Sequence, residues 1–309
     1  MTGRTAAPRA RDPVLVGEGA AAALGRRLLR VWTVLGSNRK AAAGSAIVLF
    51  FVLMAILAPV LAPGNPIASR FALSQAPSFA HPLGTTNSGQ DVLAQVIWGA
   101  RASVEVGLVC ASIATALAVI VGMVAGYVGG VVDELLSLMT NVFLVIPALP
   151  LIIVLASYIP AHGETRVIMV ISFTGWAWGA RVMRSITMTL RGKDFVLSAR
   201  VAGERTWHIV FQEILPNVTS LVAASFMFTC IYAILTEAYL EFLGLGNLNI
   251  VSWGTILYWA SNSNALMLGA WWWFIPPGLC IGLLGAGFAL LNYAIDEITN
   301  PRLRAEGVR

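Results

Sequence analysis

Two glutamates, Glu237 and Glu241, lie four residues apart near the end of an apolar stretch. In a helix this spacing places both carboxylates on one face. Carboxylates at membrane depth are costly and usually face a cavity or a partner group. The pair therefore has two interpretations, a proton relay or a structural hydrogen bond to a neighbouring helix. We favour the structural interpretation.

Other residues that commonly do chemistry are scattered along the chain. Cys110, Cys230 and Cys280 fall within apolar runs without metal-ligand spacing, so we expect small buried side chains. The three histidines belong to separate segments. No Gly-x-x-x-x-Gly-Lys-[Ser/Thr] motif occurs, so the chain has no P-loop for ATP. The sequence thus predicts no catalytic site, no metal and no cofactor on this chain.

The composition is that of a protein that crosses a membrane several times. Of 309 residues, 58% are hydrophobic and 11% are charged, and the mean hydropathy is +0.78. A helix of about 20 apolar residues spans roughly 30 Å of hydrocarbon. We predict an all-α membrane protein with six spans, at about 44–63, 101–128, 134–158, 166–187, 218–243 and 274–296.

The basic residues are unevenly divided between the two sides of this topology. Eight lie before residue 44, six lie between 181 and 205, and three follow residue 301. Only Arg70, Arg101 and Arg166 fall on the other side. Positive charge favours the cytoplasmic side, so we expect both termini and the loop 188–217 to be cytoplasmic. The pI of about 9.4 then reflects topology and anionic lipid rather than nucleic-acid binding.

The topology divides the chain into four regions. In the first region, Leu24, Leu28 and Trp32 recur at helical spacing, which predicts an amphipathic helix lying on the membrane surface. The four regions are 1–43, a cytoplasmic tail; 44–100, the first span and an external segment; 101–300, a core of five spans; and 301–309, a second cytoplasmic tail.

The loop 188–217 has an amphipathic pattern of its own. Phe195, Val196 and Ala199 are spaced as one face of a short helix. Gly203 follows where a helix end favours a left-handed residue. The loop is either a docking element for a partner on the membrane face or an ordinary amphipathic cytoplasmic loop.

The run from Asp194 to Gly203, with a Leu-Pro pair about a dozen residues later, resembles the EAA loop of ABC importer permeases. In that family the loop forms a coupling helix that sits in a cleft of the ATPase subunit. Leu197 and Ser198 depart from the pattern, because they occupy the positions of its Glu and its first Ala. The residues that the resemblance implies for coupling are Asp194, Phe195, Ser198, Ala199, Arg200, Gly203, Leu215 and Pro216.

Other motifs resemble, in the same order, the dipeptide, oligopeptide and nickel branch of these permeases. They include His81-Pro-Leu-Gly-Thr85, Gly99-Ala-Arg-Ala-Ser103 and Phe242-Leu-Gly-Leu-Gly246. Glu237 is shared with the branch, whereas Glu241 stands where Ser is more common, and Asn141 where many members have Asp. The candidate pathway or structural polar residues are therefore Asn141, Glu237 and Glu241.

The resemblance covers about residues 42–304 and implies the type I ABC importer architecture in a bacterial cytoplasmic membrane. It implies a homologous second permease, an extracytoplasmic binding protein, and two ABC ATPase subunits, or one fused ATPase, that bind ATP and Mg. The substrate is then a dipeptide, an oligopeptide, a nickel chelate, glutathione or haem. The alternatives are a stand-alone secondary transporter that uses Glu237 and Glu241 and, as a third class, a membrane-embedded enzyme.

Overall fold

The computed structural model describes residues 39–159 and 164–299, and within these ranges its regular structure is helical. The predicted surface helix near Leu24 and the tail 301–309 lie outside the described residues. The helices are α2 (Arg39–Leu61), α3 (Val92–Val128), α4 (Gly130–Val145), α5 (Ala148–Tyr158), α6 (Glu164–Gly175), α7 (Ala177–Leu190), α8 (Asp194–Val201), α9 (Thr206–His208), η1 (Ile209–Ile214), η2 (Leu215–Val218), α10 (Thr219–Phe242), α11 (Trp253–Asn262) and α12 (Trp271–Thr299).

Within the described ranges, four helices are long and apolar enough to cross a membrane. They are α2, α3, the continuous helix Thr206–Phe242 that ends with α10, and α12 up to Ile295. The pair α4 and α5 adds a fifth span if it is counted as one, although its two halves bend by 96°. The prediction of an all-helical membrane protein is confirmed, and six spans remain a prediction.

The bend between α4 and α5 has a local cause. Pro147 has no backbone N–H, and a proline disfavours helical dihedrals in the residue before it. Ile146 accordingly has an extended conformation, with φ −68° and ψ 128°. Pro150 lies in the first turn of α5, where a missing N–H leaves no helical bond unmade. The predicted span 134–158 is therefore two helices that meet at Pro147.

The predicted span 166–187 is also divided. It is occupied by α6, of 12 residues, and α7, of 14 residues, which are separated at Trp176. Neither helix alone reaches the length of about 20 residues that a crossing requires. The helix α3 differs from prediction at its start, because it begins at Val92 rather than at residue 101. Asp91 caps it there by accepting a hydrogen bond from the Ala94 N–H at 2.9 Å.

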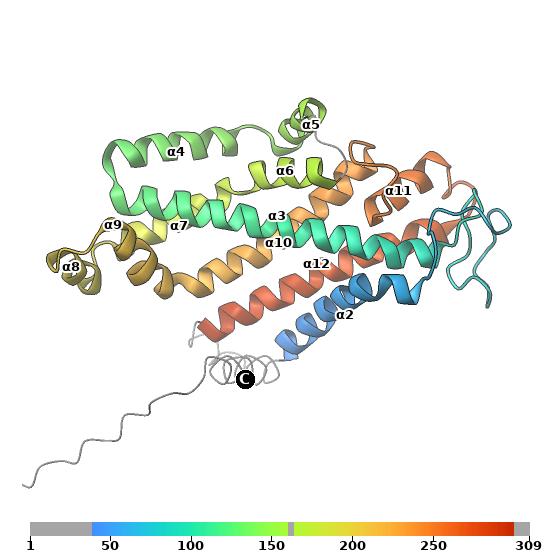
Figure 1. The fold of residues 1–309 in the computed structure, drawn as a ribbon, viewed down its shortest axis with the longest axis horizontal. Helices are drawn as coiled ribbons and strands as arrows, with labels where there is room; N and C mark the ends of the chain where they lie inside the picture. The colour runs from blue at the N-terminus through green and yellow to red at the C-terminus, as the bar shows by residue number, and fades with distance from the viewer. Residues whose placement is uncertain (1–38, 160–163, 300–309) are drawn as a thin grey trace, which may run out of the picture.

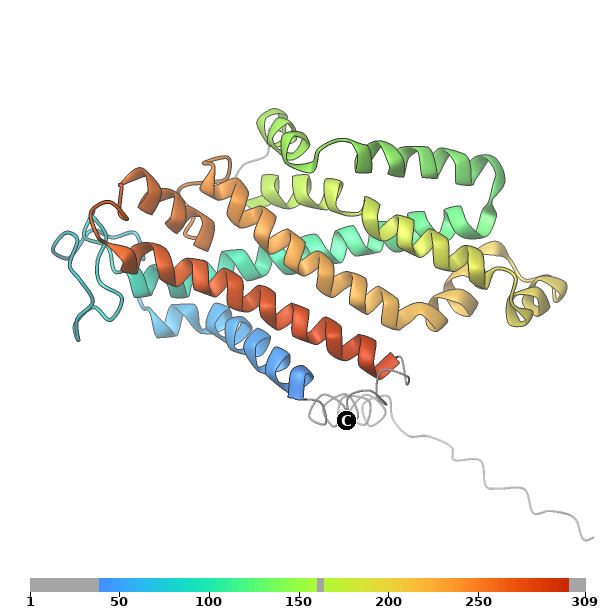
Figure 2. The ribbon, with the colours of Figure 1, turned by 180° about the vertical axis from the view of Figure 1, so that it is seen from behind.

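The helices form an elongated bundle whose two ends differ (Figures 1 and 2). Helix α3 runs along most of its length, with α7 and α10 packed against it, and α2 lies beside α12. The segment 62–91 and α11 gather at one end. Helices α8 and α9 lie at the opposite end. The two segments that carry the main family motifs are thus separated by the length of the bundle.

Helix α3 approaches α7 closely because glycines face that helix. A Cβ on Gly122 would lie 2.7 Å from the Cβ of Met183, and a Cβ on Gly126 would lie 2.6 Å from the Arg184 carbonyl oxygen. Small residues four apart are a common means of bringing helix backbones together in membranes. The close contact holds α3 and α7 together, and the loop after α7 packs against the ends of both helices.

Candidate functional site

Helix α8 occupies the centre of the loop after α7, as the sequence predicts. It ends at Val201, and Gly203 follows with φ +82°. The Gly203 N–H donates to the Arg200 carbonyl at 3.1 Å, and the Glu204 N–H donates to the Ala199 carbonyl at 3.1 Å. This pattern is a left-handed helix end that satisfies otherwise unpaired carbonyls. The conformation predicted for Gly203 is confirmed.

One face of α8 packs against the chain itself. Val196 is fully buried, in a cluster with Met123 of α3, Met183 of α7 and Ile209 of the following helix. Phe195 packs against the same cluster, as does Ala199. Within this chain Phe195 and Ala199 already have packing partners, and their contact with an ATPase stays a prediction. The face is used to attach α8 to the ends of α3 and α7.

The opposite face of α8 is open. Leu197 is 42% exposed, Val201 is 90% exposed, and Trp207 in the next turn is 61% exposed. Among the other residues that the sequence proposed for coupling, half-buried Leu215 packs against the cluster that contains Val196. The exposed ones are Asp194, Ser198, Arg200, Gly203 and Pro216. The predicted coupling residues are therefore divided between an anchoring face and a free face.

A second contact fixes α8 to α3. The Arg200 guanidinium lies over the ring of Tyr127, with 5.6 Å between the guanidinium carbon and the ring centroid. A cation above an aromatic face is attracted by the ring quadrupole. Tyr127 is the last residue but one of α3 and belongs to the same cluster as Val196. Arg200 follows Val196 by four residues, so the two contacts come from the same side of α8.

The helix after α8 begins earlier than predicted. Helix is continuous from Thr206, whereas the predicted span begins at residue 218. Pro216 lies within it, in a short 3₁₀ turn that follows a π-helical turn over Ile209–Ile214. Proline cannot donate to the helical ladder, so a change of helix type around it re-satisfies the backbone. The polar loop is therefore shorter than its sequence suggests.

Near the same end, two polar pairs join α4 to α7. The Arg184 guanidinium forms an ion pair with Asp133, including an Nη2–Oδ2 bond of 2.7 Å. Arg181 donates from Nη2 to the Asn141 side-chain oxygen at 2.8 Å. Both arginines line a cavity of about 210 Å³ between α3, α4 and α7. Asn141 thus has a structural partner, and its role in a pathway stays a prediction.

Glu237 and Glu241 form a buried polar node towards the other end of the bundle. They are 0% and 2% exposed. The Ser103 hydroxyl of α3 donates to Glu237 Oε2 at 3.2 Å and accepts from the Trp253 N–H at 3.4 Å. Trp253 in turn donates from Nε1 to the Val96 carbonyl at 3.0 Å. Glu237 therefore joins α10 to α3 and α11, as the structural interpretation predicts.

Glycines make the room that Glu241 occupies. A Cβ on Gly254 would lie 2.8 Å from the Glu241 Cβ, and a Cβ on Gly246 would lie 2.6 Å from its Cγ. Ser252 caps α11 and forms a capping box with Thr255. Gly246 of the Phe-Leu-Gly-Leu-Gly motif and Gly254 of α11 thus enclose Glu241. Glu241 Oε2 has no hydrogen-bond partner among the described residues.

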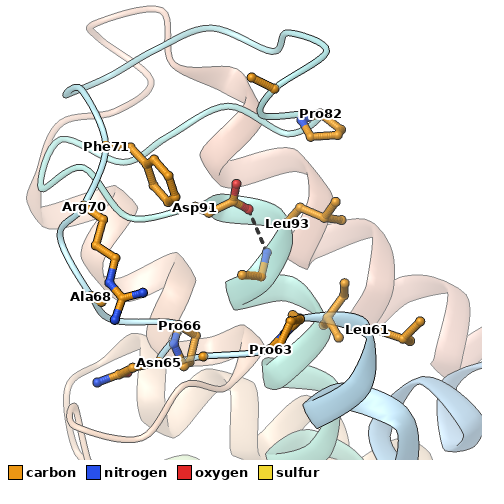
Figure 3. A pocket seen from close by; sticks show the side chains of 15 residues that line it. Leu61, Pro63, Asn65, Pro66, Ala68, Arg70, Phe71, Pro82, Asp91 and Leu93 are labelled. Carbon is orange, nitrogen blue, oxygen red and sulfur yellow. Dashed lines mark hydrogen bonds between the residues drawn. The ribbon is translucent and has the colours of Figure 1, made fainter.

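The segment 62–91 is an ordered cap on the end that holds α11. His81 Nδ1 lies 2.7 Å from Asp91 Oδ2, and Thr85 accepts from the Gln75 N–H at 2.8 Å. A cavity of about 310 Å³ lies between this segment and the adjoining ends of α2 and α3. Figure 3 shows its lining, which includes Arg70, Asp91 and mostly apolar side chains. The turn at the His-Pro-Leu-Gly-Thr motif therefore holds Asp91 where it caps α3.

The bundle of long apolar helices, with polar caps at both ends, defines a multi-pass membrane protein. Residues 118–305 match the family model described as binding-protein-dependent transport system inner membrane component, and residues 27–81 match the N-terminal transmembrane domain of oligopeptide transport permease C. The chain belongs to this inner-membrane permease family. The family consists of transport permeases rather than enzymes, and the protein is a multi-pass inner-membrane protein.

Curated relatives are similar over nearly their full lengths. The dipeptide transport system permease protein DppC of Bacillus subtilis is 31% identical, over 88% of this chain and 85% of the relative. DppC of Haemophilus influenzae is 32% identical, over 90% and 95%. The oligopeptide transport system permease protein OppC of Bacillus subtilis is 29% identical, over 95% and 97%. The resemblance to the permease C type is thus confirmed.

Two side-chain contacts, Ser103–Glu237 and Asp133–Arg184, were not predicted from the sequence. Ser103 and Glu237 are 134 residues apart, and Asp133 and Arg184 are 51 residues apart. A signal was nevertheless present, because Ser103 closes the Gly-Ala-Arg-Ala-Ser motif and Asp133 stands at the start of an apolar run. Periodicity places such residues on a helix face but does not say which helix faces it.

Proposed function

We propose that the chain is the C-type permease subunit of an ATP-driven importer of di- or oligopeptides. It pairs with a homologous second permease, and each contributes half of the translocation pathway. Two ABC ATPase subunits, or one fused ATPase, bind ATP and Mg, and an extracytoplasmic binding protein delivers the substrate. Support for the substrate class comes from relatives named as dipeptide and oligopeptide permeases.

The coupling part of the proposal rests on the two faces of α8, one of which packs against the chain while the other is exposed. Its inner face is locked to α3 and α7 through Val196, while Leu197 and Val201 face outward. Large apolar side chains on an exposed helix are typical of a protein interface. A partner that binds the exposed face of α8 moves this helix. Because the other face packs against α3 and α7, the movement is passed to α3, α7 and the helix that begins at Thr206.

The same proposal sets the orientation. Six basic residues in or near the α8 loop favour the cytoplasmic side for that end of the bundle. The segment 62–91, at the opposite end, then faces the side from which a binding protein delivers substrate. Both chain termini are cytoplasmic in this orientation.

The environment of the glutamates supports this function over secondary transport. A proton relay across a membrane needs carboxylates that reach an aqueous path. Glu237 instead accepts from Ser103, and Glu241 is enclosed by Gly246 and Gly254. Both side chains are buried at the contact of α10, α3 and α11. The hydrogen bond from Ser103 gives Glu237 a structural role without transport chemistry.

Reconstitution tests the proposal directly. The complex of this chain with its partner permease, ATPases and binding protein is placed in proteoliposomes and supplied with a labelled mixture of di- and oligopeptides. We expect uptake that requires ATP and the binding protein and that persists when an uncoupler removes the proton gradient. Uptake that continues without ATP and stops with the uncoupler contradicts the proposal and supports a secondary transporter.

A further inference from the structure

A cavity of about 450 Å³ opens at the end of the bundle that carries the segment 62–91. Its wall combines α3, the first residue of α6, the segment 65–67 and the loop 249–251 after α10. Cavities of 300 to 1,000 Å³ are typical of small-molecule sites. A substrate that enters from the side opposite to α8 meets this end of the bundle first.

Three charged side chains line this cavity. Arg101 and Glu105 lie one turn apart on α3, and Glu164 begins α6. Trp98, Ile250 and Val251 supply apolar wall beside them. The site therefore offers one positive group, two negative groups and apolar surface, which are the features that a small zwitterionic ligand with an apolar side chain requires.

The charged groups of these three residues are available to a ligand. Within residues 39–159 and 164–299, none of them forms an ion pair, whereas Asp133 pairs with Arg184 and Asp91 pairs with His81. Glu164 is nevertheless within electrostatic reach of both Glu105 and Arg101. It is also only partly exposed, so its carboxylate is less well solvated than a free surface group. The three groups are close enough to act on one ligand.

We propose that this cavity binds zwitterionic peptides by their charged ends. Glu105 and Glu164 accept hydrogen bonds from the ligand's α-ammonium group, and Arg101 donates to its carboxylate. Charge-assisted hydrogen bonds of this kind are roughly twice as strong as neutral ones. The inference rests on the proposed import of peptides and adds to it a receiving site for the free amino terminus.

Equilibrium binding of labelled dialanine tests the site on the purified transporter complex without its binding protein. We expect the wild-type complex to bind dialanine and to bind N-acetyl-dialanine at least about tenfold more weakly, because acetylation removes the ammonium charge. The Glu105→Gln/Glu164→Gln double variant and the Arg101→Gln variant should each weaken dialanine binding by about tenfold. Glu134→Gln is the matched control, because Glu134 is an exposed acid near the start of α4 and does not line this cavity.

Two results overturn the site. One is no measurable dialanine binding to the wild-type complex, and the other is equal binding by wild type and the double variant. ATP-dependent peptide uptake, measured on the same preparation, separates this failure from failure of the proposed function. If uptake persists while binding is unaffected by the variants, only the receiving site is wrong. If the wild-type protein shows no ATP-dependent uptake, the import function itself is wrong.

Discussion

The Arg200 guanidinium of α8 lies over the Tyr127 ring of α3, 5.6 Å from its centroid. This contact crosses from the loop helix to the helix that runs along most of the bundle. It acts together with buried Val196, which attaches the same loop helix to α3 and α7. The loop helix is therefore held at two points, and each point can be weakened separately.

Loss of the Arg200–Tyr127 contact should weaken coupling moderately. A cation–π contact at an exposed site contributes about 0.5–1 kcal/mol, which corresponds to about two- to fivefold in an equilibrium. Arg200→Gln and Tyr127→Leu should each lower peptide uptake per ATP hydrolysed by about that factor. Tyr127→Phe keeps the ring and should behave as wild type, as should Arg205→Gln, an exposed arginine beyond the end of α8. Equal loss in Tyr127→Phe and Tyr127→Leu would show that the ring is not the contact that matters.

Removal of charge from the glutamate pair should leave transport driven by ATP. Glu237→Gln keeps an oxygen that can accept from Ser103, and Glu241→Gln keeps the shape that fits between Gly246 and Gly254. We expect each variant to retain most of its ATP-driven uptake, with no sensitivity to an uncoupler. Proteoliposome uptake with ATP held constant measures this. A collapse of uptake in either variant, without loss of assembled complex, contradicts a structural role.

Close packing around Glu241 makes Gly254 intolerant of a side chain. A Cβ there would lie 2.8 Å from both the Glu241 Cβ and the Ala238 carbonyl oxygen. Overpacking of this kind typically costs about 1–3 kcal/mol. Gly254→Ala should therefore lower the thermal stability of the purified complex. Gly282→Ala in α12 is the control, since nothing lies within 4 Å of a Cβ there; equal stability of the two variants contradicts the packing argument.

Reporter fusions test the orientation. A reporter after Arg309 should behave as cytoplasmic, and one inserted near Ser74 should behave as external, because the basic residues favour the α8 end as the inner side. Ser74 is exposed in the segment 62–91, so an insertion there displaces no core residue. The reverse pattern at either site contradicts the positive-inside argument.

Much of the local structure follows from local chemistry. The short helix in the loop after α7 and its end at Gly203 were predicted, because caps and turns depend on residues within one helical turn. The bend at Pro147 follows from a missing N–H. Such features need no knowledge of which helix packs on which.

The errors concern relations across the bundle. The apolar face of α8 was recognised, but its packing against α3 and α7 was not predicted, because hydrophobic periodicity shows that a face is buried but not what buries it. The helix Thr206–Phe242 was begun too late, since a polar stretch with Pro216 has the composition of a loop although it continues a helix. The link from Ser103 to Glu237 depends on the register of two helices that are far apart in the chain.

The most direct measurement of the coupling function compares two loop glycines. Gly203 and Gly192 both have open space around them, but only Gly203 has a positive φ, of +82°. A side chain in that conformation costs ~1 kcal/mol or more, which corresponds to about fivefold or more in the population of the native helix end.

Uptake per ATP hydrolysed is measured for Gly203→Val and Gly192→Val in complexes of equal expression. The account predicts that Gly192→Val transports normally. Gly203→Val should insert and pair with its sister permease, but its ATPases should dissociate or hydrolyse ATP without transport. Normal uptake per ATP in a well-expressed Gly203→Val complex would show that the α8 loop is not the coupling element.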